Sequence, residues 1–206
     1  MSLRLVLLVL GVSGICVAAH AASPAFPTRA DALPVFVPKG MQVETQLEAD
    51  LNGDGSEDVA AIIRGEDERY LLVAVREGKG LRRVGLGELD AYPLGDASLK
   101  APKGVLVIED LTGGTSAVSS RYRYRYEAAT DRMRLIGDDV TYYSRTNQHD
   151  AIEISTNRLT GTRITKIRKL VKGDYVDQKP KQSKVAIKKF YIENAPVAEM
   201  TLGIGG

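Results

Sequence analysis

Short apolar runs separated by turn residues dominate the chain beyond Gly40, and they predict β-strands. Residues 59–63 and 70–75 are rich in β-branched and other apolar side chains and end at glycine or charged residues, and residues 104–108 repeat the pattern. Further strands are predicted at 133–136, 140–144, 151–155, 163–170 and 184–192. No long segment shows the 3.6-residue spacing of an amphipathic helix.

The segment 121–126 reads Arg-Tyr-Arg-Tyr-Arg-Tyr, a strict alternation of two side-chain types. Successive side chains of a strand point to opposite faces, so this segment predicts a strand with its tyrosines on one face and its arginines on the other. Turn signals separate the predicted strands, at Gly137-Asp138-Asp139, Thr160-Gly161, Gly173-Asp174 and Lys179-Pro180.

These patterns predict a mainly β, single-domain protein. Many short strands with turns at intervals of about 8 to 12 residues are typical of an antiparallel β-sandwich, or of a strongly curved sheet that closes toward a barrel. Residues 22–40 contain four prolines, at 24, 27, 34 and 38. This N-terminal part is therefore expected to be extended, with at most one short turn of helix.

The first residues have the pattern of a cleavable export signal. A charged start is followed by a short apolar run and by Ala19-His20-Ala21, which predicts cleavage after Ala21 and a mature domain of residues 22–206. The alternatives are an uncleaved anchor, for which the run is shorter than about 20 residues, and a lipoprotein signal at Cys16, which the bulky Ile15 disfavours.

Cleavage removes the only cysteine, so the mature chain has no disulfide. An export signal without a disulfide framework indicates a bacterial periplasm as the location. No later stretch is apolar enough to span a bilayer, so we expect no stable membrane insertion after cleavage.

Charge is distributed unevenly along the chain. Residues 44–68 contain nine acidic side chains against one arginine, whereas residues 158–189 contain eleven Lys or Arg against two Asp. A basic segment is one feature of nucleic-acid-binding proteins, but no recognition motif accompanies it here, and an exported protein rarely meets nucleic acid. We interpret the basic end as a solvated face and expect no nucleic-acid partner.

The most specific motif is the acidic segment 50–58, Asp-Leu-Asn-Gly-Asp-Gly-Ser-Glu-Asp. Oxygen-bearing side chains occupy positions 1, 3, 5 and 9, glycine occupies position 6, and position 7 can offer a backbone carbonyl. The spacing predicts a calcium site, whose ligands are Asp50, Asn52, Asp54, Ser56 and Asp58. The alternative is an Asn-Gly/Asp-Gly hairpin turn that binds no metal.

Two features distinguish this segment from an EF-hand. Position 12 is Ala61 rather than glutamate, and a predicted strand follows instead of a helix. The segment resembles the loops of FG-GAP and VCBS-type β modules, in which the ninth-position aspartate completes the site and leads into a strand. Calcium is plentiful outside the cytoplasm, so even a site with a Kd of about 10⁻⁴ to 10⁻³ M would be filled and would stabilise the fold.

Catalytic motifs are scarce, and we predict no catalytic residues and no enzyme activity. His149 adjoins Asp150 in a polar stretch that favours an exposed turn. There is no nucleophile elbow, no zinc-ligand spacing and no phosphate-binding loop. The adjacent carboxylates 109–110 and 138–139 would point to opposite faces of a strand, which does not suit a glycosidase pair.

The segment 111–122 is interpreted as a polar loop that precedes the tyrosine strand. It contains Gly113-Gly114-Thr115-Ser116 and ends in Ser119-Ser120-Arg121-Tyr122. Arginine and tyrosine are enriched in binding hot spots. The alternative interpretation is a hairpin loop whose tyrosines pack inward.

Several motifs in order give the chain a family resemblance. The export signal, Val37-Pro38-Lys39-Gly40-Met41, the acidic segment, Gly113-Gly114-Thr115-Ser116, Leu135-Ile136-Gly137 and the segment 155–161 together resemble a group of exported bacterial proteins. That group includes the periplasmic immunity proteins that guard against peptidoglycan-cleaving effectors of bacteria-killing type IV secretion systems, and it is similar to periplasmic lysozyme inhibitors.

The resemblance implies inhibition of a lysozyme-like hydrolase by a loop that enters its catalytic cleft. In such inhibitors a Ser-x-x-Tyr or Ser-Gly-x-Tyr loop binds the catalytic carboxylates. Ser119, Ser120, Arg121 and Tyr122 match the first pattern, whereas Ser120 stands where the second has glycine. Two other hypotheses stay open: a calcium-dependent periplasmic scaffold or carbohydrate-binding module, and an unrecognised hydrolase.

Overall fold

The computed structural model describes residues 25–203, so the predicted signal segment 1–21 lies outside the described residues. Strands dominate the described part, in two antiparallel sheets. Sheet A has the strand order β1-β5-β4-β3-β2, and sheet B has the order β12-β11-β10-β9-β8-β7-β6, with β13 also paired to β11. Neither sheet closes on itself within residues 25–203, and the prediction of a mainly β, sandwich-type fold is confirmed.

The strands of sheet A are β1 (Arg29–Ala30), β2 (Gln42–Ala49), β3 (Asp58–Arg64), β4 (Arg69–Glu77) and β5 (Gly80–Glu88). Sheet B contains β6 (Ser98–Lys100), β7 (Leu106–Gly113), β8 (Ser116–Glu127), β9 (Arg132–Ser144), β10 (Ala151–Asn157), β11 (Thr162–Val171), β12 (Asp174–Asp177) and β13 (Lys181–Lys184). The helical elements are short: α1 (Leu33–Phe36), η1 (Pro102–Gly104), η2 (Ile192–Asn194) and α2 (Ala198–Leu202). The expected single short turn of helix among the N-terminal prolines is α1.

Sheet A is buried on both faces, which explains the nearly continuous apolar runs of β3 and β4. One face, with Ile62, Leu71 and Val73, packs against Leu106 and Tyr124 of sheet B. The other face packs under the N-terminal segment, through the cluster of Phe26, Leu33, Phe36, Val59, Ala61, Ile63, Leu72, Ala74 and Leu81. Removal of this apolar surface from water is the main driving force of the fold.

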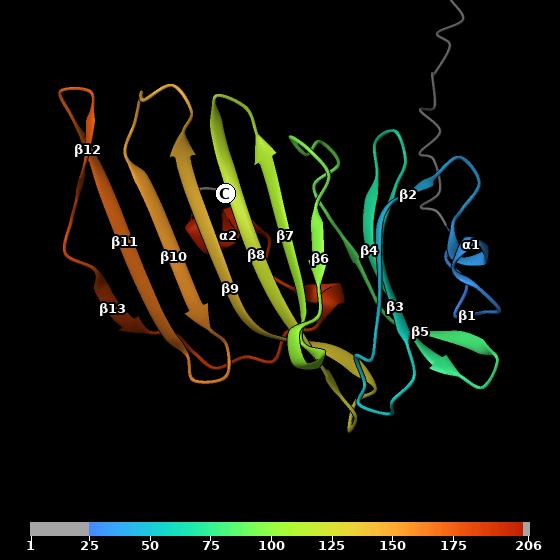
Figure 1. Cartoon of the computed structure of the whole chain (residues 1–206). Coiled ribbons are helices and arrows are strands. Elements are labelled where there is room, and N and C mark those ends of the chain that lie inside the picture. The colour runs from blue at the N-terminus through green and yellow to red at the C-terminus, as the bar shows by residue number, and fades with distance from the viewer. Residues whose placement is uncertain (1–24, 204–206) are drawn as a thin grey trace, which may run out of the picture.

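Only part of sheet B faces sheet A. Beyond that overlap, the C-terminal segment covers the inner face of β8–β10, where Leu202 of α2 packs with Val118, Val140 and Ile154. Figure 1 shows α2 and the red C-terminal segment behind β8 and β9, while the near face of sheet B has no covering element. Sheet B therefore has one buried face and one open face.

The tyrosine–arginine alternation is confirmed in β8. Tyr124 is buried in the core between the sheets, and Tyr122 and Tyr126 pack against the same cluster. Arg121 and Arg125 are exposed on the opposite face. The strand thus divides the molecule into an apolar inner layer and a polar outer layer.

Two predicted boundaries in the second half of the chain are wrong. Residues 133–136 and 140–144 belong to one strand, β9, because Gly137 lies at a bulge opposite Arg123 and the pairing continues through Asp138 and Asp139. The prediction of a strand at 184–192 is wrong, because β13 ends at Lys184 and residues 185–191 run to η2 without strand pairing, apart from an isolated bridge at Tyr191. Phe190 and Ile192 pack into the core between the sheets, and the sequence pattern does not distinguish such packing from strand pairing.

A buried charge cluster joins the two sheets. The guanidinium of Arg69, on β4, donates through Nε and Nη2 to Glu44 at 2.7 and 2.6 Å, and through Nη1 to Asp110 of β7 at 2.7 Å. Further donations go from Nη2 to Asp110 at 3.2 Å and from Nη1 to the Asp90 carbonyl at 3.3 Å. All five N–H donors of Arg69 are therefore used, at a side chain with no exposed surface.

The sequence brings Glu44 into this cluster by a β-bulge. The register of β2 on β3 shifts between Val43 and Thr45, so Glu44 is the extra residue. Burial alone would raise the pKa of Glu44, but the hydrogen bonds from Arg69 and from the Ala97 N–H lower it, so the group is ionised. A charged pair with complete hydrogen bonding is the form in which ions persist inside a protein.

Replacing Arg69 by Met tests this cluster. The change leaves two buried carboxylates without their cation, and we expect a loss of about 3–5 kcal/mol in the free energy of unfolding, measured by urea denaturation. The control is Lys166→Met, which removes an exposed cation paired with Glu153 and is expected to cost less than about 1 kcal/mol. Equal losses in the two variants would contradict the role of Arg69.

Glu127 fastens the far end of the β8–β9 hairpin to the C-terminal segment. Its carboxylate accepts hydrogen bonds from the Tyr191 hydroxyl at 2.7 Å, from Lys189 at 3.0 Å and from Thr130 at 2.8 Å. These partners, Tyr191 first, lower the pKa of Glu127 from 4.5 to about 2. A lowered pKa in the folded state favours folding at neutral pH, where the carboxylate is ionised.

The pH dependence follows from the sign of this shift. The contribution of Glu127 is complete above pH 4.5 and is lost as the pH falls toward 2. The Glu127→Gln variant lacks this contribution at every pH, so its stability should fall less than that of the wild type over this interval. Urea midpoints at a series of pH values measure the difference, and parallel curves for the two proteins would contradict it.

Candidate functional site

The acidic segment 50–58 forms the turn between β2 and β3, as the sequence predicts. Gly53 and Gly55 both have φ of +85°, a conformation that favours glycine. Their N–H groups donate to the two carboxylate oxygens of Asp50, at 2.7 and 3.0 Å. The glycines thus allow the backbone to wrap around the Asp50 side chain.

Asn52 and Asp54 continue this arrangement. The Asp54 N–H donates to Asn52 Oδ1 at 2.9 Å, and the Ser56 N–H donates to Asp54 Oδ1 at 2.7 Å. The amide of Asn52, followed by the Ser56 N–H, lowers the pKa of Asp54, which is therefore ionised at neutral pH. Each of these side-chain oxygens accepts one hydrogen bond and keeps lone-pair capacity for a cation.

Asp58 differs from the other acidic residues of the loop because it is fully buried. Its Oδ2 accepts the N–H groups of Leu51 and Asn52 at 2.9 and 3.1 Å, and its Oδ1 accepts the Arg76 N–H at 2.8 Å. Three backbone donors use most of its acceptor capacity. Asp58 therefore holds the base of the loop to β4.

The donor chemistry of the loop fits calcium through three of its side chains. Asp50, Asn52 and Asp54 offer exposed or half-exposed oxygens, and the Ser56 carbonyl can add another. Among residues 25–203, no three His, Cys, Asp or Glu side chains converge as a metal centre. Asn52 and backbone carbonyls fall outside that set of residue types, and calcium accepts both as ligands.

The four residues predicted to bind a partner lie in strand β8, so the interpretation of 111–122 as one loop is wrong. The turn between β7 and β8 comprises only Gly114 and Thr115, and Ser119 pairs with Leu111 of β7 and Thr141 of β9. The glycines and hydroxyl side chains are typical of a turn, but β7 and β8 pair with each other almost to the tip of their hairpin. The segment is accordingly rigid.

Strand alternation also separates these four residues. Ser119 and Arg121 lie on the open face, whereas Ser120 and Tyr122 lie on the inner face. The Tyr122 hydroxyl donates to the Pro196 carbonyl at 3.0 Å, and burial, followed by the nearby carboxylates of Asp138 and Glu199, raises its pKa. Tyr122 therefore fixes the C-terminal segment and does not share a surface with Arg121.

The open face of sheet B carries rows of paired charges. Arg121 Nε donates to Glu109 at 2.7 Å, and Lys100 donates to the same carboxylate at 3.0 Å. Beside them, Arg123 of β8 and Ser155 of β10 both donate to Asp139 of β9 at 2.7 Å. The hydrogen bonds from Lys100 and Arg121 lower the pKa of Glu109, so this face presents ionised groups of both signs.

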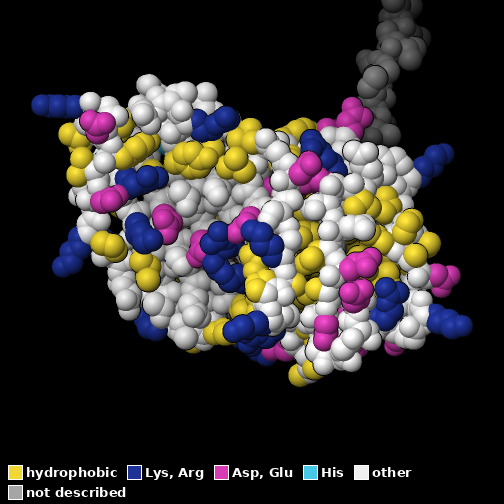
Figure 2. Space-filling view, viewed as in Figure 1, with side chains coloured by type: hydrophobic (Ala, Val, Ile, Leu, Met, Phe, Trp, Pro, Cys, Tyr) yellow, Lys and Arg dark blue, Asp and Glu magenta, His cyan; other side chains and the backbone are white. Residues whose placement is uncertain are grey.

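Figure 2, in the same view as Figure 1, shows blue and magenta side chains together on this face, beside a largely white area. Two shallow grooves adjoin on this face and share Thr141 and Glu153. One of them is also lined by Ser119, Arg121 and Asp139. The cross-strand neighbours Glu109, Asp139 and Thr141 were not among the predicted site residues. Strand register placed them there, and the sequence alone does not give that register.

His149 does not form a pair with the Asp150 side chain. Its Nε2 lies 2.9 Å from Ser116 Oγ, its Nδ1 lies 2.7 Å from the Asp150 carbonyl, and its ring stacks on Tyr142. The Asp150 carboxylate instead accepts from Lys169 and from the Leu170 N–H. The absence of catalytic residues stays a prediction.

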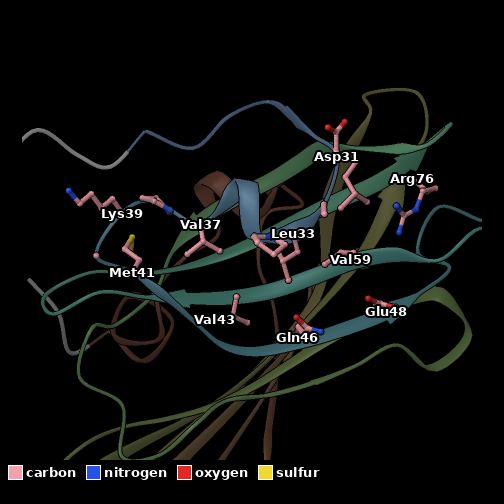
Figure 3. Close-up of a pocket in the computed structure, with 15 residues that line it drawn as sticks. Asp31, Leu33, Val37, Lys39, Met41, Val43, Gln46, Glu48, Val59 and Arg76 are labelled. Atoms are coloured by element: carbon pink, nitrogen blue, oxygen red, sulfur yellow. The ribbon is translucent and has the colours of Figure 1, made fainter.

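A larger cavity lies on the other side of sheet A, between α1 and strands β2 and β3. It measures about 610 Å³, and its inner surface includes Leu33, Met41 and Val59. Figure 3 shows Lys39 at one end and Glu48 and Arg76 at the other, with apolar side chains between them. Apolar side chains thus separate Lys39 from Glu48 and Arg76.

Comparison with known proteins gives no relative: no protein-family model, no curated protein and no solved structure matches the chain. No helix within residues 25–203 is long and apolar enough to cross a membrane.

Calcium should stabilise the protein through the segment 50–58. At about 100 times its Kd, a ligand that binds only the folded state contributes about 2.7 kcal/mol, which raises Tm by about 5–10 °C in a domain of this size. Thermal unfolding followed by circular dichroism in calcium and in EDTA measures the effect.

Two variants separate the roles of the loop carboxylates. Asp54→Asn should abolish most of the calcium-dependent rise and leave Tm in EDTA nearly unchanged, because Asp54 is exposed. Asp58→Asn should lower Tm in both conditions, because it weakens the three hydrogen bonds of a buried carboxylate. Glu66→Gln, at an exposed position outside the loop, is the matched control. An identical Tm for the wild type in calcium and in EDTA would refute the site.

Proposed function

We propose that this protein is an exported, calcium-stabilised inhibitor that binds a lysozyme-like peptidoglycan hydrolase and thereby protects the cell that carries it. The observation that supports this function best is the open face of sheet B, where Ser119 and Arg121 stand side by side on a central strand. The inner face of the same strand is packed, so the open face is the one available to a partner.

The chemistry of this face suits an acidic cleft. Glycoside hydrolases act through a pair of carboxylates. A guanidinium binds a carboxylate with two parallel, charge-assisted hydrogen bonds, and the side chain of Arg121 is 49% exposed. Arg121 is now paired with Glu109, and binding would exchange this carboxylate for one of the hydrolase. Glu109 would keep its ion pair with Lys100.

The β7–β8 turn lies at one end of this face. Gly113, Gly114 and Thr115 are exposed, and the Arg145 N–H donates to the Thr115 carbonyl at 2.8 Å, which fixes the turn to the end of β9. We infer that the turn enters the cleft of the hydrolase, while Ser119 and Arg121 bind at its rim. A preformed turn loses little conformational entropy on binding.

A carbohydrate-binding or scaffold function is the second candidate. It is favoured by the adjoining grooves on the same face, where Glu109, Asp139 and Glu153 offer acceptors beside the hydroxyl of Thr141. Sugar hydroxyl groups donate readily to carboxylates. In this case the ligand would lie along the grooves and the β7–β8 turn would not be needed.

Substitution of Arg121 distinguishes these functions. In assays of lysozyme-like hydrolases of several classes, the wild type should inhibit at least one enzyme, and Arg121→Ala should weaken that inhibition by about 2 kcal/mol or more, the size of a binding hot spot. Arg125→Ala removes another exposed arginine of the same strand and is the matched control, with a change below about 0.5 kcal/mol.

Tyr122→Phe gives a further control. It deletes only the hydroxyl that binds Pro196, so inhibition by the folded protein should be retained. Loss of inhibition in Tyr122→Phe with none in Arg121→Ala would refute the proposed face. Failure to inhibit any hydrolase, together with binding to peptidoglycan fragments that competes at the grooves, would support the carbohydrate-binding function instead.

A further inference from the structure

A second cavity, of about 350 Å³, lies inside the sandwich where the two covers of sheet B meet. Sheet A covers one part of the inner face and the C-terminal segment covers the other, and the cavity occupies the space between them. Its walls come from β4, the end of β5, β7, β8 and residues 192–199. This volume lies within the range of small-molecule sites.

Most of the wall is apolar. Leu71 and Ile108 contribute from the two sheets, Tyr124 lies beside them, and Ala195 and Val197 close the C-terminal side. An empty apolar cavity has a cost in stability, because its lining atoms lack packing partners. A ligand with an apolar body would restore those contacts.

The C-terminal wall is held in place at two points. A Cβ atom on Gly87 would lie 2.6 Å from the Ile192 carbonyl oxygen, so the glycine allows η2 to approach β5 closely. Further along, Pro196 accepts the hydrogen bond of the Tyr122 hydroxyl. The cavity therefore has fixed walls, which favours a ligand of defined size.

The charged residues that line the cavity are all acidic. Four of its lining residues carry carboxylates, and none is Lys, Arg or His; the four are Glu88, Asp90, Asp110 and Glu199. Asp110 shares the single guanidinium of Arg69 with Glu44, so this buried cluster holds two carboxylates for one cation. Both oxygens of Asp110 accept N–H donors, as an ionised carboxylate does.

We propose that this cavity binds a small organic cation, a molecule with an apolar body and one protonated amine. The apolar body would fill the space beside Leu71 and Ile108, and the amine would lie toward Glu199 and the net negative charge of the Arg69 cluster. An anion of the same shape would be repelled, and a neutral molecule would lack the charged hydrogen bonds. The cavity is not lined by Ser119 or Arg121, so a test of ligand binding there is independent of the proposed inhibition.

Phenethylamine is a suitable probe, with phenethyl alcohol as its neutral counterpart and hydrocinnamate as an anion of similar shape. Titration followed by ¹H–¹⁵N NMR should give saturable shifts in the amides of residues 195 and 197–199 with phenethylamine. Binding of the alcohol should be about tenfold weaker, and hydrocinnamate should give no saturable shift. Higher salt should weaken only the binding of the amine.

Two variants locate the ligand. Glu199→Gln should weaken phenethylamine binding about three- to tenfold, whereas Glu193→Gln, which alters a carboxylate of the same segment that faces Arg132 outside the cavity, should leave it unchanged. Ala195→Leu fills part of the space and should abolish binding, with a thermal melt to establish that it is folded. Equal affinity for the amine and the alcohol, or equal affinity of the two glutamate variants, would overturn the proposal.

Discussion

The buried guanidinium of Arg69 is the interaction on which the arrangement of the two sheets depends. It binds Glu44 of β2 and Asp110 of β7 at once, so it fixes the distance between sheet A and sheet B at the edge where they adjoin. A pair of apolar layers alone could slide, because hydrophobic contact has no direction. The two hydrogen bonds from Arg69 to Asp110 cross between the sheets, and such directed bonds specify one alignment.

This alignment determines which surfaces are open. Sheet A is covered on both sides, and sheet B is covered on its inner face by sheet A and the C-terminal segment. The face with Arg121 and Glu109 is left uncovered, and the seam between the two covers leaves the acidic cavity. Both proposed sites thus follow from the offset between a five-stranded and an eight-stranded sheet.

Local pattern in the sequence was enough to predict the strands but not their partners. The runs at 59–63 and 70–75 lie within β3 and β4, and the alternation at 121–126 gave the correct faces of β8. The pattern failed where tertiary context decides: Gly137-Asp138-Asp139 looks like a turn but continues β9, because Asp138 is paired with Arg158 and Asp139 with Arg123. Such long-range pairs have no signal in a single sequence.

In the candidate sites, too, the local pattern was predictable and the features set by tertiary context were not. The spacing of the segment 50–58 specified a tight acidic loop, since a local motif carries its own geometry, but the burial of Asp58 depends on the Arg76 N–H of a neighbouring strand. For the partner-binding residues, the sequence named Ser119 and Arg121 and could not separate them from Ser120 and Tyr122. That separation requires knowledge that the segment is a paired strand.

The order of strands also bears on how the chain folds. Almost every ladder joins strands that are neighbours in the sequence, so most hairpins can form from local contacts, which favours rapid folding. The exceptions are β1, which pairs with β5, β13, which pairs with β11, and the C-terminal segment, which returns to β5 and β9. Until that segment arrives, the apolar inner face of β8–β10 is open to solvent. The C-terminal segment therefore completes the packing of sheet B, and a chain that lacks this segment is the species most exposed to aggregation.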